Sequence, residues 1–305
     1  MRLVIALGGN ALLHRGERPD AAIQTARLSL AAPGLARLAD EHELVLVHGN
    51  GPQVGMLAEE SAADAALSAP YPLSALVAET QGLIGSQLSL ALRNAGLVGM
   101  VTTVITHTVI DAHDPRRDVP SKFIGPSYDR RRARRLAAEH GWEVAEDGDS
   151  WRRVVPSPLP QRILEIDAAT ALLKSGMTVV LAGGGGVPVS DHDGLHTLDA
   201  VVDKDHAAAL IARTVSADRL VILTDVPGVI ADYGTPDATV IAASTPAALR
   251  QWDFPDGSMG PKVAAVCDFV SSTRRTAAIG ALEHAEEVVM GTLGTQITPD
   301  VLGPR

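Results

Sequence analysis

The 305-residue chain contains one cysteine, Cys267, which excludes an internal disulfide and a cysteine-based metal cluster. Aromatic residues make up only 3% of it, and no apolar run approaches the roughly 20 residues that a membrane-spanning helix needs. Basic residues are fewer than acidic ones, 26 against 36, which disfavours nucleic acid or an anionic membrane as the main partner. With no signal peptide before the first apolar run, we expect a soluble, cytoplasmic protein.

Lysine is also scarce, because 22 of the 26 basic residues are arginine. An ammonium group is a compact charge with three rotatable donors, so each lysine in such a chain is a candidate for a position that a planar guanidinium could not serve. Lys174 lies at the end of an expected helix, where a cation is favourable for structural reasons alone. The three lysines that remain are Lys122, Lys204 and Lys262.

The chain is 46% hydrophobic, and its apolar residues form short runs that alternate with stretches of helical periodicity. This pattern predicts an α/β fold, in which helices cover both faces of a mostly parallel central sheet in three layers. The expected strands are residues 3–7, 44–47, 101–105, 178–181 and 220–223, and the expected helices are residues 23–38, 54–66, 76–92, 163–174 and 203–213.

The segment from about residue 109 to residue 158 interrupts this alternation. It is rich in charged residues and proline and poor in periodic apolar residues, so we expect a surface insertion that could act as a lid. Its arginine cluster at residues 130–135 could contact nucleic acid. Without interleaved aromatic residues, and in an acidic chain, a solvated helix face is the better interpretation.

Three of the expected strands end in glycine clusters. Ligands of open parallel sheets bind beyond the carboxyl ends of the strands, where glycine lets backbone N–H groups approach an anion closely. The three turns together predict a phosphate-binding crevice, although none matches the Walker pattern or the dinucleotide fingerprint of an oxidoreductase. The clusters are Gly8-Gly9-Asn10, Gly49-Asn50-Gly51 and Gly183-Gly184-Gly185-Gly186.

The three candidate lysines lie in sequence contexts that suit a phosphoryl group. Lys204 lies between Asp203 and Asp205 at the start of an expected helix, Lys262 follows a segment rich in glycine, and Lys122 lies in the insertion. Phosphoryl transfer depends on positioning and positive charge, with little covalent chemistry from the protein. We therefore expect these lysines to act on a transferred phosphoryl group.

Seven segments form an ordered set of motifs between residues 5 and 298. They read ALGGNA (6–11), HGNGPQVG (48–55), RRVVPSP (152–158), GGGGVPV (183–189), VVDKD (201–205), ILTDV (222–226) and GSM with PK (257–259 and 261–262). In this set the chain resembles carbamate kinases, a branch of the amino acid kinase family. Other members usually carry a lysine where this chain has Ala6, whereas carbamate kinases are thought to use one from a protruding subdomain, which Lys122 would match. The family often has proline where this chain has Phe123.

The resemblance implies the amino acid kinase fold, with two lobes and a protruding lid subdomain. Residues 1–187, including the lid, would bind carbamate or carbamoyl phosphate, and residues 188–305 would bind ATP or ADP. The reaction implied is reversible phosphoryl transfer from ATP to the carboxylate of carbamate, used to make ATP in arginine or related nitrogen catabolism. Because a carboxylate is ionised at neutral pH, no general base is required. A homodimer is also implied, and Mg²⁺ is expected with the nucleotide, held mainly by phosphates and water.

The same resemblance implies three groups of site residues, and it assigns none to a metal. The catalytic group consists of Lys122, Lys204 and Lys262, with Asp205 orienting the lysines. The group that binds substrate or phosphate consists of Gly8, Gly9, Asn10, Gly49, Asn50, Gly51, Gly184 and Gly185. The nucleotide group consists of Asp203, Thr224, Asp225, Gly228, Val229, Tyr233 and Met259.

Other functions remain open at this point. Another amino acid kinase, acting on a different acid or on a nucleoside monophosphate, is disfavoured by Ala6 and by the long insertion. A ligand sensor of the same fold without turnover is disfavoured because all three motif lysines are present.

Four other side chains also have alternative roles. His192 and His196, with two neighbouring aspartates, could hold a metal, although a polar loop suits their loose spacing better. His48 could act as an acid or could be a hydrogen-bonded structural imidazole. Cys267 is most simply a small core residue.

Overall fold

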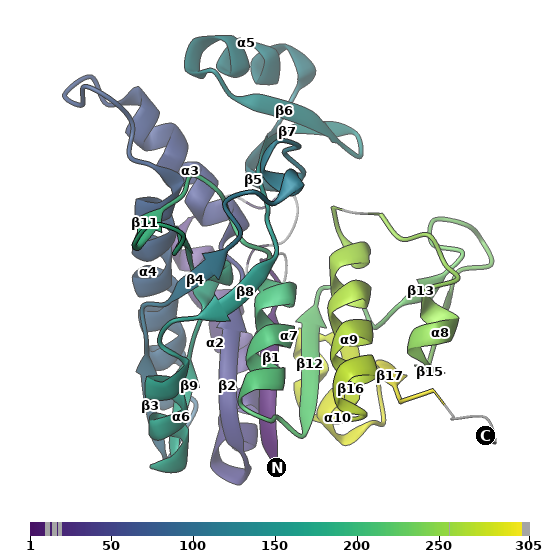
Figure 1. The fold of residues 1–305 in the computed structure, drawn as a ribbon. Helices are drawn as coiled ribbons and strands as arrows, with labels where there is room; N and C mark the ends of the chain where they lie inside the picture. Colours follow the sequence, from purple (N-terminus) through teal and green to yellow (C-terminus); the bar gives the residue numbers. More distant parts are fainter. Residues whose placement is uncertain (10–12, 14–16, 18–19, 256, 301–305) are drawn as a thin grey trace.

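An eight-stranded sheet runs through the centre of the computed structural model, which describes residues 1–9, 13, 17, 20–255 and 257–300 (Figure 1). Its strand order is β15-β17-β16-β12-β1-β2-β9-β3, and every neighbouring pair is parallel except β16 with β17. The strands are β1 (Arg2–Leu7), β2 (Glu43–His48), β3 (Met100–Thr103), β9 (Met177–Val180), β12 (Arg219–Thr224), β15 (Ala243–Ser244), β16 (Thr276–Ala281) and β17 (Thr295–Ile297).

Helices cover both faces of this sheet, so the predicted three-layer α/β fold is confirmed. Successive residues of β1 alternate between the two resulting cores, with Val4 and Ala6 on one face and Leu3 and Ile5 on the other. One face packs against α6 (Ile166–Lys174), α7 (Lys204–Thr214) and α9 (Met259–Thr273), and the other against α2 (Ala21–Glu41), α4 (Leu73–Asn94) and α10 (Ala285–Met290).

The expected strands and helices are confirmed, with shifts of a few residues at their ends and one correction. Ile163 does not begin a helix: it ends strand β8 (Pro160–Ile163), which pairs with β4 (His107–Ile110), and α6 starts at Ile166. Strand β16 was not predicted, because it consists mainly of alanine and glycine, which have low strand propensity.

The insertion folds as a unit of its own and protrudes above the carboxyl ends of the central strands (Figure 1). Strands β5 (Lys122–Tyr128), β7 (Ser150–Val155) and β6 (Glu143–Asp147) form its sheet, and α5 (Arg130–His140) packs on it. We call this unit, residues 122–155, the lid. The large sheet contains strands from both sides of residue 187. The predicted domain boundary at that residue stays a prediction.

Part of the arginine cluster contributes to the structure of the lid. The guanidinium groups of Arg130 and Arg134 lie 5.5 and 5.9 Å from the ring centroid of Trp151, and that of Arg153 lies 4.4 Å from Trp142. Such cation–π contacts stabilise a unit whose apolar core is small. The fold therefore brings aromatic residues to arginines from which they are distant in sequence.

The remaining elements connect and flank these layers. A second sheet has the order β11-β10-β4-β8. These elements are α3 (Gly51–Ala63), α8 (Pro246–Leu249), β10 (Val187–Ser190), β11 (His196–Thr197), β13 (Ile230–Ala231), β14 (Thr239–Val240) and the short helices η1 (Pro115–Arg117), η2 (Gly183–Gly185) and η3 (Leu282–His284).

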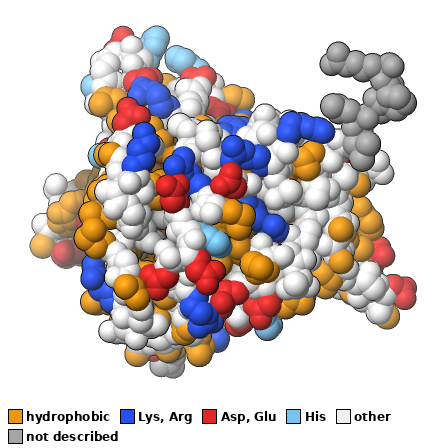
Figure 2. Space-filling model, turned by 90° about the horizontal axis from the view of Figure 1, so that it is seen from below, with side chains coloured by type: hydrophobic (Ala, Val, Ile, Leu, Met, Phe, Trp, Pro, Cys, Tyr) orange, Lys and Arg blue, Asp and Glu red, His pale blue; other side chains and the backbone are white. Residues whose placement is uncertain are grey.

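The end of the molecule at which β1 begins carries acidic and basic side chains intermingled (Figure 2). At the amino ends of the strands, Arg2 pairs with Glu43 at 2.7 Å and Arg275 with Asp218 at 3.0 Å. In the described part of the chain, no helix has both the length and the apolar character needed to cross a membrane.

Phe269 on α9 has the largest side chain among the fully buried residues, and its core position predicts a large effect on stability. We expect Phe269→Ala to lower the free energy of unfolding by about 3–5 kcal/mol, because the substitution removes buried apolar contacts and leaves a cavity. Phe269→Leu should cost less, since it keeps most of the volume. Urea denaturation at fixed protein concentration measures both, and equal losses would contradict a packing role.

Candidate active site

The glycine turns at the carboxyl ends of β1 and β2 lie against each other. The backbone N–H of Gly49 donates to the carbonyl of Leu7 at 2.9 Å, which ties the second turn to the first strand. A Cβ atom added at Gly49 would lie 2.8 Å from the backbone nitrogen of Gly9 and 3.3 Å from Cδ of Lys204. Glycine is therefore required at position 49, and the side chain of Lys204 lies at the junction of the two turns.

The four-glycine turn after β9 packs on the second turn just as closely. A Cβ atom at Gly183 would lie 2.3 Å from Nε2 of His48, and one at Gly184 would lie 2.1 Å from Nδ2 of Asn50. The three turns predicted from the sequence thus meet at one edge of the sheet. Asn10 lies outside the described residues, so its predicted role stays untested.

Asp205 holds two lysines that come from two different helices. Its Oδ1 accepts a hydrogen bond from Nζ of Lys204, and its Oδ2 accepts one from Nζ of Lys262 at 3.3 Å. Asp205 and Lys204 begin α7, whereas Lys262 lies in the first turn of α9. Burial alone would raise the pKa of Asp205, but the two ammonium groups lower it below its ordinary value, so the carboxylate stays ionised.

The two lysines differ in how firmly they hold their protons. Burial lowers the pKa of Lys204 to about 8, although the charge of Asp205 opposes this shift. Burial acts in the same direction on Lys262, but Asp205 and Asp203 more than compensate, and the pKa of Lys262 is raised. Both lysines are therefore charged at neutral pH, and only Lys204 titrates near pH 8.

Lys122 reaches this cluster from the lid. Its Nζ donates to Oδ2 of Asp203 at 2.6 Å, while Oδ1 of Asp203 accepts the backbone N–H of Asp205 at 2.8 Å and so caps α7. Burial alone would raise the pKa of Asp203, but Lys122 and the neighbouring cations lower it below its usual range. All three lysines singled out in the sequence thus belong to one cluster, which consists of Lys122, Lys204 and Lys262 with Asp203 and Asp205.

The residues of the predicted nucleotide group have different environments. Thr224 is buried at the end of β12 and donates to Asp225 at 3.0 Å. Met259 begins α9, the helix that carries Lys262. Tyr233 is 75% exposed, in the turn between β13 and β14. The environments of these residues do not test their predicted roles.

Gly228 and Val229, also assigned to this group, are packed against the end of the sheet. Val229 is fully buried, its N–H donates to Oγ1 of Thr295 at 2.7 Å, and its carbonyl accepts from the N–H of Ile241. A Cβ atom at Gly228 would lie 2.7 Å from the same Thr295 hydroxyl. Both polar backbone groups of Val229 are thus used within the protein.

His48 is fully buried between the second and third turns. Its Nδ1 hydrogen-bonds the carbonyl of Gly49 at 3.0 Å, and burial lowers its pKa to about 4. The imidazole is therefore neutral at pH 7, and its one N–H proton, on Nδ1, is donated to the carbonyl of Gly49, which favours the structural alternative. Cys267 is likewise buried in the core, as expected.

Two threonines that support the glycine turns were missed in the sequence. Oγ1 of Thr80, on α4, accepts from Nδ2 of Asn50 at 2.9 Å. Oγ1 of Thr108, on β4, donates to the carbonyl of Gly185 at 2.7 Å. Both threonines are buried and lie far in sequence from their partners, so no motif marks them.

His192 and His196 lie in exposed parts of the chain, and Nε2 of His196 is 3.0 Å from the carbonyl of Asp193. No group of three or more His, Cys, Asp or Glu side chains in residues 1–9, 13, 17, 20–255 and 257–300 is placed to hold a metal ion.

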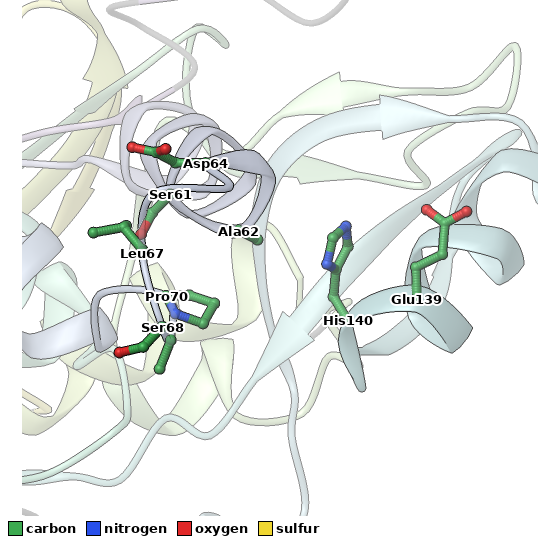
Figure 3. A pocket seen from close by; sticks show the side chains of 9 residues that line it. Ser61, Ala62, Asp64, Leu67, Ser68, Pro70, Glu139 and His140 are labelled. Atoms are coloured by element: carbon green, nitrogen blue, oxygen red, sulfur yellow. The ribbon is translucent and has the colours of Figure 1, made fainter.

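A hollow of about 340 Å³ lies elsewhere, between the end of α3 and helix α5 of the lid (Figure 3). None of the residues that line it belongs to the glycine turns or to the lysine cluster. It is lined by Ser61, Ala62, Asp64, Leu67, Ser68, Ala69, Pro70, Glu139 and His140.

A three-layer α/β fold with glycine turns and clustered lysines at one sheet edge is suited to phosphorylated ligands. The sequence model of the amino acid kinase family matches residues 1–280, and the chain belongs to this family. Within it, the resemblance to carbamate kinases is confirmed over nearly the full length. Carbamate kinase of Escherichia coli (strain K12) is 48% identical over 296 residues, covering 97% of this chain and 99% of that one.

Solved structures show the same likeness. Carbamate kinase from Giardia lamblia bound to citric acid superimposes with a TM-score of 0.91 at 34% identity, covering 98% of both chains. The Giardia lamblia enzyme bound to AMP-PNP gives a TM-score of 0.86 at 34% identity, with the same coverage.

The titration of Lys204 predicts that binding of a phosphorylated probe depends on pH. Its pKa of about 8 lies below the ordinary value, so it is protonated below pH 8 and loses its positive charge as the pH rises through that value. We expect the affinity for ADP, measured by calorimetry, to fall by about tenfold between pH 7 and 9.5, as loss of one charged hydrogen bond would give. Lys204→Met should bind more weakly and show no step near pH 8, whereas the surface variant Lys174→Met should keep the original profile. A step of unchanged size in Lys204→Met would assign it to another group.

Proposed function

We propose that the chain catalyses reversible phosphoryl transfer between ATP and the carboxylate of carbamate, with ADP and carbamoyl phosphate as the other pair. The observation that carries this proposal is the pairing of Lys204 and Lys262 on the buried carboxylate of Asp205, beside the turns of β1 and β2. Two fixed positive charges next to close-packed backbone amides suit a phosphoryl group in transfer. The full-length likeness to carbamate kinases supports carbamate as the acceptor.

In this mechanism the backbone amides of the glycine turns hold the anionic substrate. Lys204 and Lys262 neutralise the charge of the phosphoryl group as it passes between the two oxygens, and Asp205 fixes both ammonium groups in place. The acceptor carboxylate is already ionised at neutral pH, so the site needs no general base. This agrees with the environment of His48, which is buried and neutral.

Lys122 supplies a third charge that depends on the position of the lid. Its ammonium group is held by Asp203 at the entrance to α7, within the cluster. When substrate binds, a phosphate oxygen would compete with Asp203 for this ammonium group. The lid would thereby place its lysine over the substrate without a change of fold.

The nucleotide and its counter-ion would bind on the side of the cluster where Lys262 and the end of β12 lie. Asp225 lies near enough to Lys262 to raise its pKa, which links the end of β12 to the catalytic lysines. Asp203 and Asp205 are both engaged by lysines, so the residues fit an Mg²⁺ ion that is held mainly by nucleotide phosphates and water. When bound, Mg²⁺ supplies further neutralisation of the phosphate charge.

The proposed reaction is tested by ATP formation from ADP, Mg²⁺ and carbamoyl phosphate in a coupled assay. We expect turnover in the wild type and a loss of about 100-fold or more in Lys262→Ala, because one preorganised donor at the transferred group is removed. Lys174→Ala, at the exposed end of α6, is the matched control and should retain full activity. A folded wild type that binds ADP but makes no ATP would contradict the proposal and favour a sensor or another acid substrate.

We further propose that the protein acts as a homodimer in the cytoplasm, making ATP in arginine or related nitrogen catabolism. The resemblance to carbamate kinases supports these assignments. The surface offers a suitable interface, because β3 is an edge strand of the large sheet and exposed apolar side chains lie on and beside it. These are Leu83 and Leu90 on α4, Val98 in the following loop and Met100 on β3.

A charge within this apolar surface should break the dimer. We expect Leu90→Glu to shift the mass measured by light scattering from two chains to one, since the introduced carboxylate would be buried without a partner. Met290→Glu is the control, because Met290 is 70% exposed at the end of α10, which packs on β16, a strand separated from β3 by four others in the sheet. Two-chain mass in both variants would place the interface elsewhere.

A further inference from the structure

Phe123 touches both sides of the candidate active site. It follows Lys122 in strand β5 of the lid, and its side chain is half-buried. A Cβ atom at Gly257 would lie 2.9 Å from Cε2 and 3.1 Å from Cδ2 of its ring. On the other side, a Cβ atom at Gly51 would lie 3.6 Å from the backbone carbonyl of Phe123. One lid residue therefore contacts the turn after β2 and the loop before α9.

The ring of Phe123 leaves little room for a side chain at residue 257. A Cβ atom at residue 257 would force the ring of Phe123 to shift, since real Cβ atoms essentially never approach another heavy atom within 3.0 Å. The ring of Phe123 thus occupies the space that a side chain at residue 257 would fill.

The lid holds the ring from its own side. The guanidinium of Arg152, on β7, lies 5.9 Å from the ring centroid of Phe123. Nε of Arg152 also donates to the carbonyl of Gly125 at 3.1 Å. The lid strand is seated on α3 as well, because a Cβ atom at Gly55 would lie 2.1 Å from Cα of Gly125. The ring is thus a fixed projection of the lid toward the loop at residues 257–259.

That loop leads directly into the helix of Lys262. Residue 257 lies just before α9 (Met259–Thr273), and Lys262 lies in the first turn of that helix. Lys122 precedes Phe123 and is bonded to Asp203 at 2.6 Å. A shift of the ring relative to Gly257 would therefore alter the spacing between a lid lysine and a lysine of the nucleotide side.

We propose that Phe123, packed on Gly257, is a positioning residue that couples placement of Lys122 to the loop preceding α9. This inference rests on the proposed function, because Met259, which follows that loop, is among the residues that the resemblance to carbamate kinases assigns to the nucleotide. Binding of the nucleotide fixes the position of residues 257–259. These residues pack against the ring of Phe123, and the ring in turn holds Lys122 over the transferred group. Phe123 itself need not touch substrate.

Activity in a double-mutant cycle tests the coupling. We expect Gly257→Ala to lower kcat for ATP formation by about tenfold or more in the wild type, because the new methyl group displaces the ring and with it Lys122. In the Phe123→Ala background the same substitution should lower kcat by less than about threefold, since the ring is gone. Because coupling is reciprocal, replacing Phe123 alone should raise KM for ADP, by a smaller factor than it lowers kcat. Equal factors for Gly257→Ala in the two backgrounds would overturn the proposal.

The matched control removes a different aromatic residue of the lid. Trp142 belongs to the core of the lid, with Arg153 over its ring. Trp142→Ala weakens the lid in general, so Gly257→Ala should remain as harmful in that background as in the wild type. If Trp142→Ala also abolished the effect of Gly257→Ala, loosening of the whole lid would be the cause, and the specific role of Phe123 would be refuted.

A second measurement does not depend on turnover. Amide hydrogen exchange of residues 122–128, followed by mass spectrometry, should slow on addition of ADP in the wild type and in Trp142→Ala, but not in Phe123→Ala. Equal slowing in Phe123→Ala would overturn the coupling. If the wild type made no ATP, the proposed function would fail, and the exchange experiment would still decide whether the ring links the lid to the loop.

Discussion

The buried carboxylate of Asp205 is the interaction on which the site depends. It lies between two ammonium groups that would otherwise repel each other in an environment nearly closed to water. Removing one partner from a buried ionic group typically costs about 3–5 kcal/mol, because the remaining charge is left uncompensated. Lys204 and Asp205, at the start of α7, are therefore constrained both by the stability of the fold and by the proposed reaction. The glycine turns complete the constraint, since a side chain at residue 49 would clash with the backbone of Gly9 and press on Lys204.

Much of this arrangement could be predicted from the sequence, for a local physical reason. A parallel strand buried on both faces consists of a short uninterrupted apolar run, and a turn packed tightly against its neighbours has no room for side chains. Residues 3–9 and 44–51 show both patterns, so the strand and the glycine turn of each could be predicted. The scarcity of lysine singled out the three ammonium groups of the cluster. Lys204 and Lys262 lie in the first turns of α7 and α9, beside the edge that the carboxyl ends of the parallel strands share.

What could not be predicted depends on contacts between distant segments. The small core of the lid is built from residues spread over 128–151 and from cation–π contacts, which leave no periodic pattern. The ion pair of Lys122 with Asp203 spans 81 residues, and the contact of Phe123 with Gly257 spans both sides of the crevice. Strand β16 could not be predicted, because its small residues have low strand propensity and form a strand only through pairing within the complete sheet. The environment of Val229 could not be predicted either, since its partner Thr295 lies 66 residues away in the sequence.

The lysine–aspartate cluster also bears on how ligands arrive. Its three ammonium groups are close to the carboxylates of Asp203 and Asp205, and Asp225 is near Lys262, so the cluster has no large positive excess in a molecule whose net charge is −10. Anionic ligands therefore approach through a repulsive far field and are attracted only at short range, within about one Debye length of the site. Added salt screens the far field more than the buried cluster. Moderate ionic strength should thus speed encounter, the opposite of the behaviour of enzymes that steer their substrates from a distance.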